Sequence, residues 1–190
     1  RDAPSIGGCD HQDLTIDGGV VTLQPGVYCG GLEVAGTAQV TLSEGDYIIS
    51  GGRLTVAGSS VFKGEHVGFY LQGVDATINF AGQAEINLTG PLSGPMAGLL
   101  FFEDRGTAGR QHRIAAAKAD ILVGTIYLPV GTLRIDPNAR VAAKSAFTAI
   151  IAKELELDKG PELVLNADYN ATDVPVPAGL TGSGAVVLSR

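Results

Sequence analysis

The densest group of charged side chains lies in the stretch FFEDRGTAGRQHR, residues 101–113. It interrupts an apolar run with Glu103, Asp104, Arg105, Arg110 and His112. Carboxylates and a histidine are groups that can transfer protons in general acid–base catalysis. These five residues are therefore our candidate binding site, carried on a loop that could bind or cleave a polysaccharide.

A simpler interpretation of the same stretch is a solvated loop. Its Glu-Asp-Arg run would then pair internally, and exposed ion pairs of this kind contribute about 0–1 kcal/mol each. Successive side chains on a strand point to opposite faces, so Glu103 and Asp104 would not act on one substrate. We therefore predict no catalytic residue here and keep the stretch as a candidate for binding.

The two cysteines, Cys9 and Cys29, are too far apart in sequence for a CxxC metal or redox motif. We predict a disulfide between them, which would fasten the N-terminal end of the chain and would place the protein outside the cytoplasm. The alternative is a pair of reduced thiols in a cytosolic protein.

Two other histidines have acidic neighbours. His66 lies 22 positions after Glu44, and His11 lies between Asp10 and Asp13 in CDHQD. A surface contact explains the first pair, and a polar N-terminal segment explains the second group. The sequence contains no GxSxG, HExxH, Walker or EF-hand motif. We predict no metal site and no cofactor.

The composition limits the class of protein. Of 190 residues, 45% are apolar and only 17% are charged, and 27 are glycine. This is enough apolar material for one domain, residues 1–190, and too much for a disordered chain. The net charge of −7 argues against nucleic acid as a partner. No apolar run reaches transmembrane length. Because the chain starts at Arg1, we expect a processed product or a piece, with any membrane contact through a segment absent from it.

The elements that would position these side chains come from an internal repeat. A step of 22 positions carries Leu32, Val34, Val40, Tyr47 and Ile49 onto Leu54, Val56, Phe62, Phe69 and Leu71. A second step carries Leu54 and Val56 onto Ala76 and Ile78, and Leu14 and Ile16 precede Leu32 and Val34 by 18 positions. Apolar residues alternate within each unit, which indicates short half-buried strands separated by glycine-rich corners.

Three short strands and three corners in about 20 residues predict one turn of an all-β, right-handed parallel β-helix, a β-solenoid. A propeller blade needs a longer period, and a sandwich would not explain the 22-residue step. Further strands are expected over residues 84–90, 97–103, 120–129, 131–136, 146–157 and 161–169. Residues 113–120, RIAAAKAD, lean towards a helical turn because of their Ala and Lys content, with another strand as the alternative. Because solenoid ends expose strand edges, we expect residues 1–13 to form a cap or lead-in and residues 171–190 a tail or cap.

Several phrases together, VTLQPGVYCGGL, GSSVFKGEHVGFYL, SGPMAGLLFFEDR, GTIYLPVGTLRI and YNATDVPVPAG, resemble the C-terminal region of TadG-like proteins, which are associated with assembly of the Flp/Tad (tight adherence) pilus of bacteria. The resemblance covers about residues 9–179. It implies a membrane anchor ahead of this region, an extracytoplasmic location (periplasmic, cell-surface or secreted) and a part in adhesion, and it supplies no active-site residues.

The resulting hypothesis is a non-enzymatic structural or adhesive module of a Tad-type pilus or another cell-surface assembly. Its partners would be pilus or envelope proteins and surface glycans, and its exposed strand edges would allow self-association. The alternative is a carbohydrate-binding or polysaccharide-cleaving β-helix that uses residues 103–113.

Overall fold

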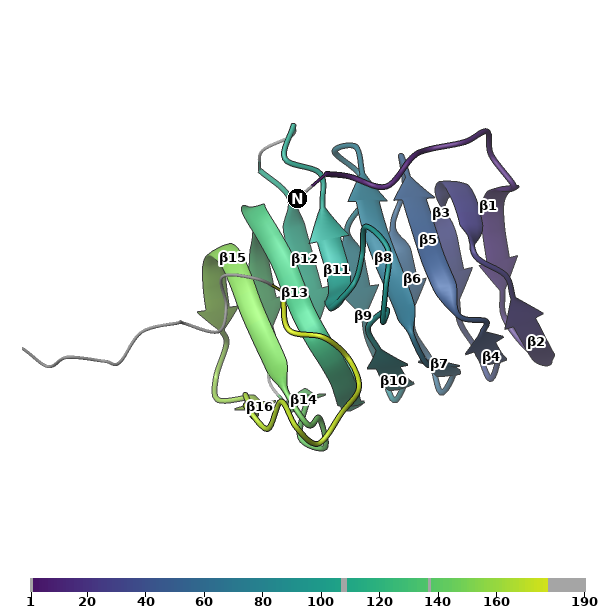
Figure 1. Ribbon diagram of the computed structural model, residues 1–190. Helices are drawn as coiled ribbons and strands as arrows, with labels where there is room; N and C mark the ends of the chain where they lie inside the picture. Colours follow the sequence, from purple (N-terminus) through teal and green to yellow (C-terminus); the bar gives the residue numbers. More distant parts are fainter. Residues whose placement is uncertain (1, 107–108, 137, 178–190) are drawn as a thin grey trace, which may run out of the picture.

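The computed structural model describes residues 2–106, 109–136 and 138–177. Its regular structure is one 16-stranded sheet that winds around itself in about seven turns. Neighbouring strands are parallel throughout the stack (Figure 1). The predicted β-solenoid is therefore confirmed. Among the described residues there is no helix with the length and apolar character needed to cross a membrane.

Each turn contributes to three faces. Face 1 consists of β1 (His11–Ile16), the second half of β3 (Gly26–Val34), β6 (Leu54–Val56), β9 (Ile78–Phe80), β12 (Gln111–Ile114) and the ends of β13 (Lys118–Ile135) and β15 (Thr148–Leu157). Face 2 consists of β2 (Val20–Leu23), β4 (Gln39–Leu42), β7 (Val61–Gly64), β10 (Glu85–Thr89), the start of β13, β14 (Arg140–Val141) and β16 (Glu162–Leu163). Face 3 consists of the start of β3, β5 (Gly45–Ser50), β8 (Val67–Gln72), β11 (Leu99–Glu103), the middle of β13 and the start of β15.

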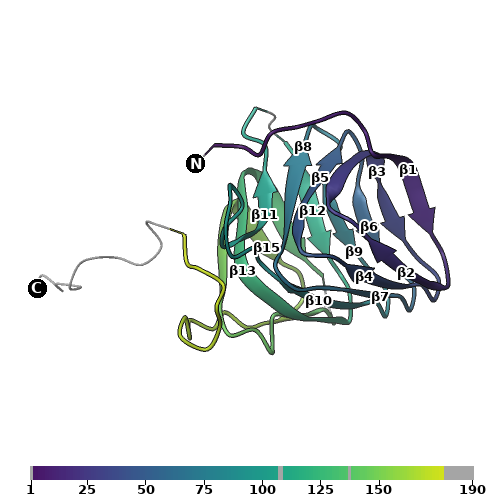
Figure 2. The ribbon, with the colours of Figure 1, turned by 45° about the vertical axis from the view of Figure 1, so that its right-hand side comes forward.

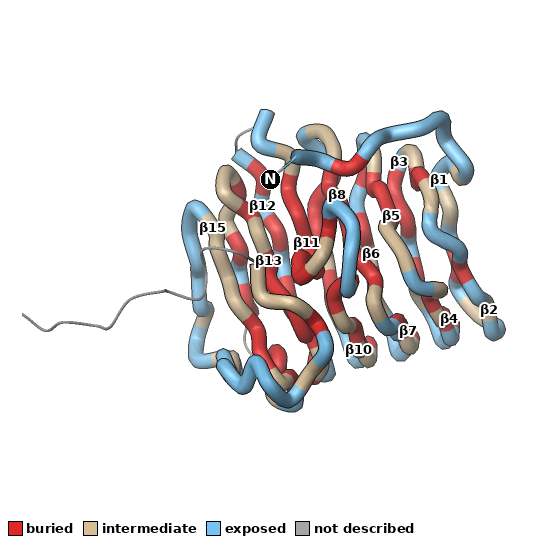
Figure 3. Tube along the Cα trace, viewed as in Figure 1, coloured by how far each residue is buried: buried red, intermediate tan, exposed pale blue. Residues whose placement is uncertain are grey.

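The core is a set of ladders of equivalent side chains inside the coil. The pairs Leu32–Leu54, Val40–Phe62 and Tyr47–Phe69 lie in register, as the 22-residue step predicts. Alternate residues on each strand point inward, and those in the middle turns are almost wholly buried (Figure 3). Aromatic rings continue down the axis, with the Tyr47, Phe69 and Phe101 rings 5.5 and 5.3 Å apart in succession. Each turn therefore buries its apolar side chains against its two neighbours.

The predicted second step of 22 residues, from Leu54 to Ala76 and from Val56 to Ile78, is wrong. Leu54 pairs with Ile78 and Val56 with Phe80, so this turn has 24 residues. The corner between β8 and β9 is two residues longer than the corner between β5 and β6, and it carries the exposed Val74. The extra residues lie in the corner and take no part in strand pairing. They therefore bulge outward, and the ladder of paired residues continues unchanged.

The later turns also differ from expectation. Residues 113–120 form no helical turn: β12 ends at Ile114 and β13 begins at Lys118. The strands expected over 120–129 and 131–136 are one strand, β13, that bends around a corner from face 3 to face 1. Strand pairing on both sides outweighs the local helical preference of alanine and lysine.

A disulfide joins Cys9 to Cys29, as predicted, with a Cα–Cα distance of 5.7 Å. It connects the segment ahead of β1 to β3 of the next turn. From there, the first residues run along the side of the solenoid towards β11 (Figures 1 and 2). Of the segment expected as a cap, residues 11–13 belong to β1 itself.

The C-terminal segment also lies along the side of the coil. Val174 is buried with Val123 and Phe147, and the Pro175 carbonyl lies over Gly98, where a β-carbon would come within 2.0 Å of it. Residues 178–190 of the expected tail or cap lie outside the described residues. The last turn keeps part of its inner ladder exposed, with Leu155 40% and Leu157 53% exposed on β15.

Candidate functional site

The stretch that we singled out from the sequence is split between the inside and the outside of the solenoid. Glu103 and His112 are completely buried and Arg110 is 2% exposed, whereas Arg105 lies on the outside. The solvated-loop interpretation is therefore wrong for these three buried residues. Between β11 and β12 it holds for the described residues Arg105, Gly106 and Gly109, which are exposed.

Glu103 occupies an inward position of face 3. It pairs in register with Leu71, so a carboxylate takes the place of an apolar ladder residue. Its Oε2 accepts hydrogen bonds from the backbone N–H groups of Val130 and Gly131, both at 3.0 Å. These two residues lie where β13 bends and its pairing register with β15 shifts. The carboxylate therefore satisfies donors that the bend leaves without a strand partner.

His112 occupies an inward position of face 1, paired with Leu133. The backbone N–H of Ile78 donates to its Nδ1 at 3.2 Å, so the ring proton resides on Nε2. Nε2 then donates to Glu103 Oε1 at 3.0 Å. Both ring nitrogens are occupied inside the coil, which leaves neither for a substrate.

Gly131 makes room for this pair. A β-carbon at this position would lie 2.5 Å from Glu103 Oε1 and 2.8 Å from His112 Nε2. Both distances are shorter than real β-carbon contacts, and both partners are held by other bonds. The bend in β13, its glycine and the buried acid–histidine pair therefore form one unit.

Arg110 brings a cation to the same unit. Its Nη1 donates to the Leu71 carbonyl at 3.1 Å and lies 3.7 Å from Glu103 Oε1. Its Nη2 lies 3.5 Å from Asp104 Oδ2. The arginine thus neutralises the buried carboxylate.

Asp104 and Arg105 lie towards solvent. Asp104 accepts from the Gly106 N–H at 2.8 Å, and Arg105 donates to the Tyr127 hydroxyl at 3.0 Å. The Arg105 guanidinium also stacks on the Tyr127 ring, 5.2 Å from its centroid. Glu103 is buried and Asp104 is partly exposed, although Arg110 lies close to both carboxylates. The five candidate residues form no common surface.

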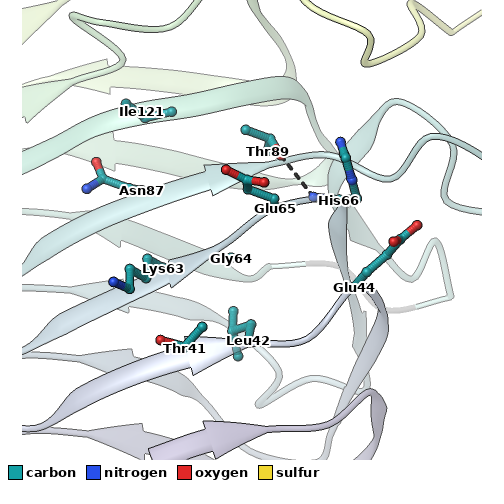
Figure 4. A pocket seen from close by; sticks show the side chains of 10 residues that line it. All are labelled: Thr41, Leu42, Glu44, Lys63, Gly64, Glu65, His66, Asn87, Thr89 and Ile121. Carbon is teal, nitrogen blue, oxygen red and sulfur yellow. Dashed lines mark hydrogen bonds between the residues drawn. The ribbon is translucent and has the colours of Figure 1, made fainter. Parts of the chain in front are cut away.

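His66 and Glu44 lie at one corner in successive turns, as the 22-residue step predicts, because Gly45 pairs with Val67. The His66 Nε2 atom lies 3.4 Å from a carboxylate oxygen of Asp173. Its backbone N–H donates to the Thr89 hydroxyl at 2.9 Å. A shallow groove on face 2 runs beside this corner, and Figure 4 shows Glu44, Glu65 and His66 projecting from its edge.

The N-terminal group around His11 has structural partners. Asp10 accepts from the Val27 backbone N–H at 2.8 Å, and the His11 ring stacks on Tyr28 at 4.6 Å. Within the described part of the chain, no three His, Cys, Asp or Glu side chains are grouped closely enough to hold a metal ion.

Sequence reasoning treated Glu103 and His112 as parts of a charged loop, although Glu103 ends the strand expected over residues 97–103. The missed signal is the alternation of FFE and HRI, which continues the in–out pattern of their strands.

The fold defines an extended β-solenoid with a buried polar cluster at one bend. Comparison with family models finds no match, and no curated protein or solved structure matches the chain.

Proposed function

We propose that this chain is a non-enzymatic structural or adhesive module of an extracytoplasmic assembly on a bacterial surface, of the Tad pilus type. The observation that carries the proposal is that Glu103 and His112 are buried and hydrogen-bonded to each other, and that Glu103 binds the backbone at the bend of β13. The groups best suited to acid–base chemistry in the densest charged stretch are thereby committed to holding the coil.

Three further features support this proposal. The solenoid presents long faces with a regular spacing of about 4.8 Å between turns, which suits repeated contacts with a partner. The Cys9–Cys29 disulfide is compatible with an oxidising compartment. The resemblance to TadG-like proteins supplies the pilus assignment.

Self-association is part of the proposal. Within the described residues, most of β15 pairs only with β13, and β1 pairs only with β3, so both ends of the stack carry free strand edges. A second copy could extend the sheet at either end.

The direct test is capture of partners from the envelope and pilus fraction of the source organism, identified by mass spectrometry. The bait is the purified folded chain, and the same chain after heat unfolding is the matched control. Enrichment of pilins or Tad components on the folded bait supports the proposal. Capture of the same proteins by the unfolded bait contradicts it.

The polysaccharide-cleaving alternative has its own test. Asp104 is the candidate carboxylate with access to solvent, so turnover of a polysaccharide that is lost in Asp104→Ala would overturn the non-enzymatic proposal. A different surface, a groove on face 1, favours carbohydrate binding without cleavage.

A further inference from the structure

Three arginines gather on face 1 of this acidic protein. Arg53 precedes β6, Arg113 lies on β12 and Arg134 lies near the end of β13. The three side chains line one shallow groove of about 360 Å³ together with Thr77, Asn79, Gln111 and Asp136. The groove therefore holds three positive charges against one negative charge, in a chain whose net charge is −7.

The strand register sets the order of these groups. Asn79, Arg113 and Arg134 stack in consecutive turns of face 1. In the neighbouring column, Thr77 leads into β9 and Gln111 pairs with Thr132. Positive charge thus runs along the axis from the turn of β6 to the turn of β13. With turns about 4.8 Å apart, this distance is about 14 Å.

Acidic residues bound the groove at both ends. Towards the N-terminal end, Glu33 is in register with Thr55 of β6, and towards the C-terminal end Glu156 is in register with Arg134. These carboxylates limit the length of ligand that can lie in the groove. The site therefore fits a short run of anionic groups.

Arg113 and Arg134 are half-exposed and are oriented by a shared carboxylate. Arg113 donates through Nε to Asp136 Oδ2 at 2.8 Å, and Arg134 donates through Nε to Asp136 Oδ1 at 2.7 Å. Arg134 also reaches Asp158 at 2.8 Å. One carboxylate cannot accept from every N–H of two guanidinium groups, so donors remain for a ligand.

Arg53 differs from the other two arginines of the groove. Its side chain is exposed and has neither an ion pair nor a hydrogen bond to any of the described residues. Asn79 lies one turn before Arg113 and Gln111 lies on the same strand as Arg113, and the amides of both likewise have no side-chain partner among those residues. Amides can both donate to and accept from hydroxyl groups.

We propose that this groove binds a carboxylated polysaccharide. The arginine forks would bind its carboxylates, and Asn79, Gln111 and Thr77 would bind its hydroxyl groups. A nucleic acid fits less well, because the groove offers no aromatic ring to stack on bases: His112 borders it, but its ring is buried inside the coil. The site stands on these contacts alone and does not depend on the pilus assignment.

Binding of polygalacturonate, measured by affinity electrophoresis and titration calorimetry at low and high salt, tests the proposal. The matched probe is the same polymer with its carboxylates methyl-esterified. We expect polygalacturonate to bind, its affinity to fall with salt, and the esterified polymer to bind at least roughly tenfold more weakly.

Arg53→Glu is the variant of choice, because the Arg53 side chain has no ion pair or hydrogen bond to any described residue, and its backbone carbonyl, which accepts from the Leu32 N–H, is kept in the variant. Arg113→Ala would also remove one of the two guanidinium partners of Asp136. Lys63→Glu makes the same charge change on face 2, where Lys63 is exposed and has no ion pair with any described residue. We expect Arg53→Glu to weaken binding roughly tenfold and Lys63→Glu to change it less than about twofold.

Four outcomes would overturn the proposal. The first is that polygalacturonate does not bind, and the second is that the esterified polymer binds equally. The third is an equal effect of Arg53→Glu and Lys63→Glu, which would indicate only the overall charge. The fourth is tighter binding of a single-stranded oligonucleotide, which would assign the groove to nucleic acid. Failure here would leave capture of pilus proteins unaffected, so the two proposals can fail separately.

Discussion

At the scale of single residues, the most informative position is Glu103. A buried carboxylate is costly unless every oxygen has a partner, and here two backbone N–H groups, His112 and Arg110 supply them. The same carboxylate in solvent would gain little from any of these contacts. Its importance therefore depends on burial and not on the charged neighbours that first drew attention to it.

Glu103→Ala should destabilise the fold by about 3 kcal/mol, because it leaves the Arg110 cation without its buried counter-charge and two buried N–H groups without an acceptor. Asp104→Ala is the matched control: the neighbouring carboxylate is partly exposed and should cost less than about 1 kcal/mol. Urea unfolding followed by circular dichroism measures both. Equal shifts in the two midpoints would show that the buried network does not hold the bend.

Asp136 makes stability depend on pH. Burial raises the pKa of its carboxyl group, but hydrogen bonds and charge from Arg113 and Arg134 outweigh burial and lower the pKa below 3.8. A lowered folded-state pKa stabilises the protein above the unfolded value, and this contribution is lost as the pH falls through the folded pKa. Asp136→Asn should therefore lower the melting temperature at neutral pH. The difference from the parent should vanish once the pH falls below the lowered pKa of Asp136 in the folded protein.

Asp46 provides a contrast with the opposite sign. Burial raises the pKa of its carboxyl group above 3.8, so its ionised form costs stability at neutral pH. Asp46→Asn should raise the melting temperature at neutral pH, and the gain should disappear as the pH falls below 3.8. If both variants shift stability in the same direction, the local environments do not control these titrations.

At the scale of the elements, the strands are short and the corners decide how they stack. Two adjacent glycines between β5 and β6 show two separate reasons for glycine. Gly51 has a φ of 68°, with open space around a β-carbon. A β-carbon on Gly52 would lie 1.9 Å from the Gly30 carbonyl oxygen of the preceding turn. Gly51 is needed because its backbone is in the left-handed region. Gly52 is needed because two turns approach each other too closely for a β-carbon.

Gly52→Ala should therefore cost about 3 kcal/mol or more, because backbone of the preceding turn must move. Gly51→Ala should cost only about 1 kcal/mol, the strain of a left-handed alanine. Differential scanning calorimetry of the two variants, side by side, separates the effects. A larger loss for Gly51→Ala would mean that close approach of the turns is not the limiting factor.

At the scale of the whole molecule, the stack is open at its C-terminal end. Leu155 and Leu157 continue the ladders of Leu133 and Ile135, but no further described strand covers them. Their exposure follows from the architecture, since an inward-facing ladder residue needs a turn on both sides.

The double variant Leu155→Lys/Leu157→Lys should reduce self-association at high protein concentration, because lysines block apolar stacking and discourage strand pairing. Light scattering over a concentration series measures it. Val74→Lys, at an exposed corner away from the ends, is the control and should behave like the parent. A parent that remains monomeric at every concentration, or a control that dissociates equally, would argue against stacking through this end.

The sequence by itself determined the solenoid. Alternating residues such as Leu32 and Val34, repeated at Leu54 and Val56 between glycine corners, can bury their apolar sides only by stacking turn on turn. Its two cysteines also predicted the disulfide, since both lie close to the first turn.

Only the tertiary structure decided where the polar groups lie. The corners vary in length, so the register of Glu103, His112 and the three arginines of face 1 accumulates shifts that no fixed period supplies. Arg53, Arg113 and Arg134 line one groove because strands far apart in sequence stack on one face. Glu103 and His112 are buried because the bend of β13 offers them partners, and those partners lie in a different segment of the chain.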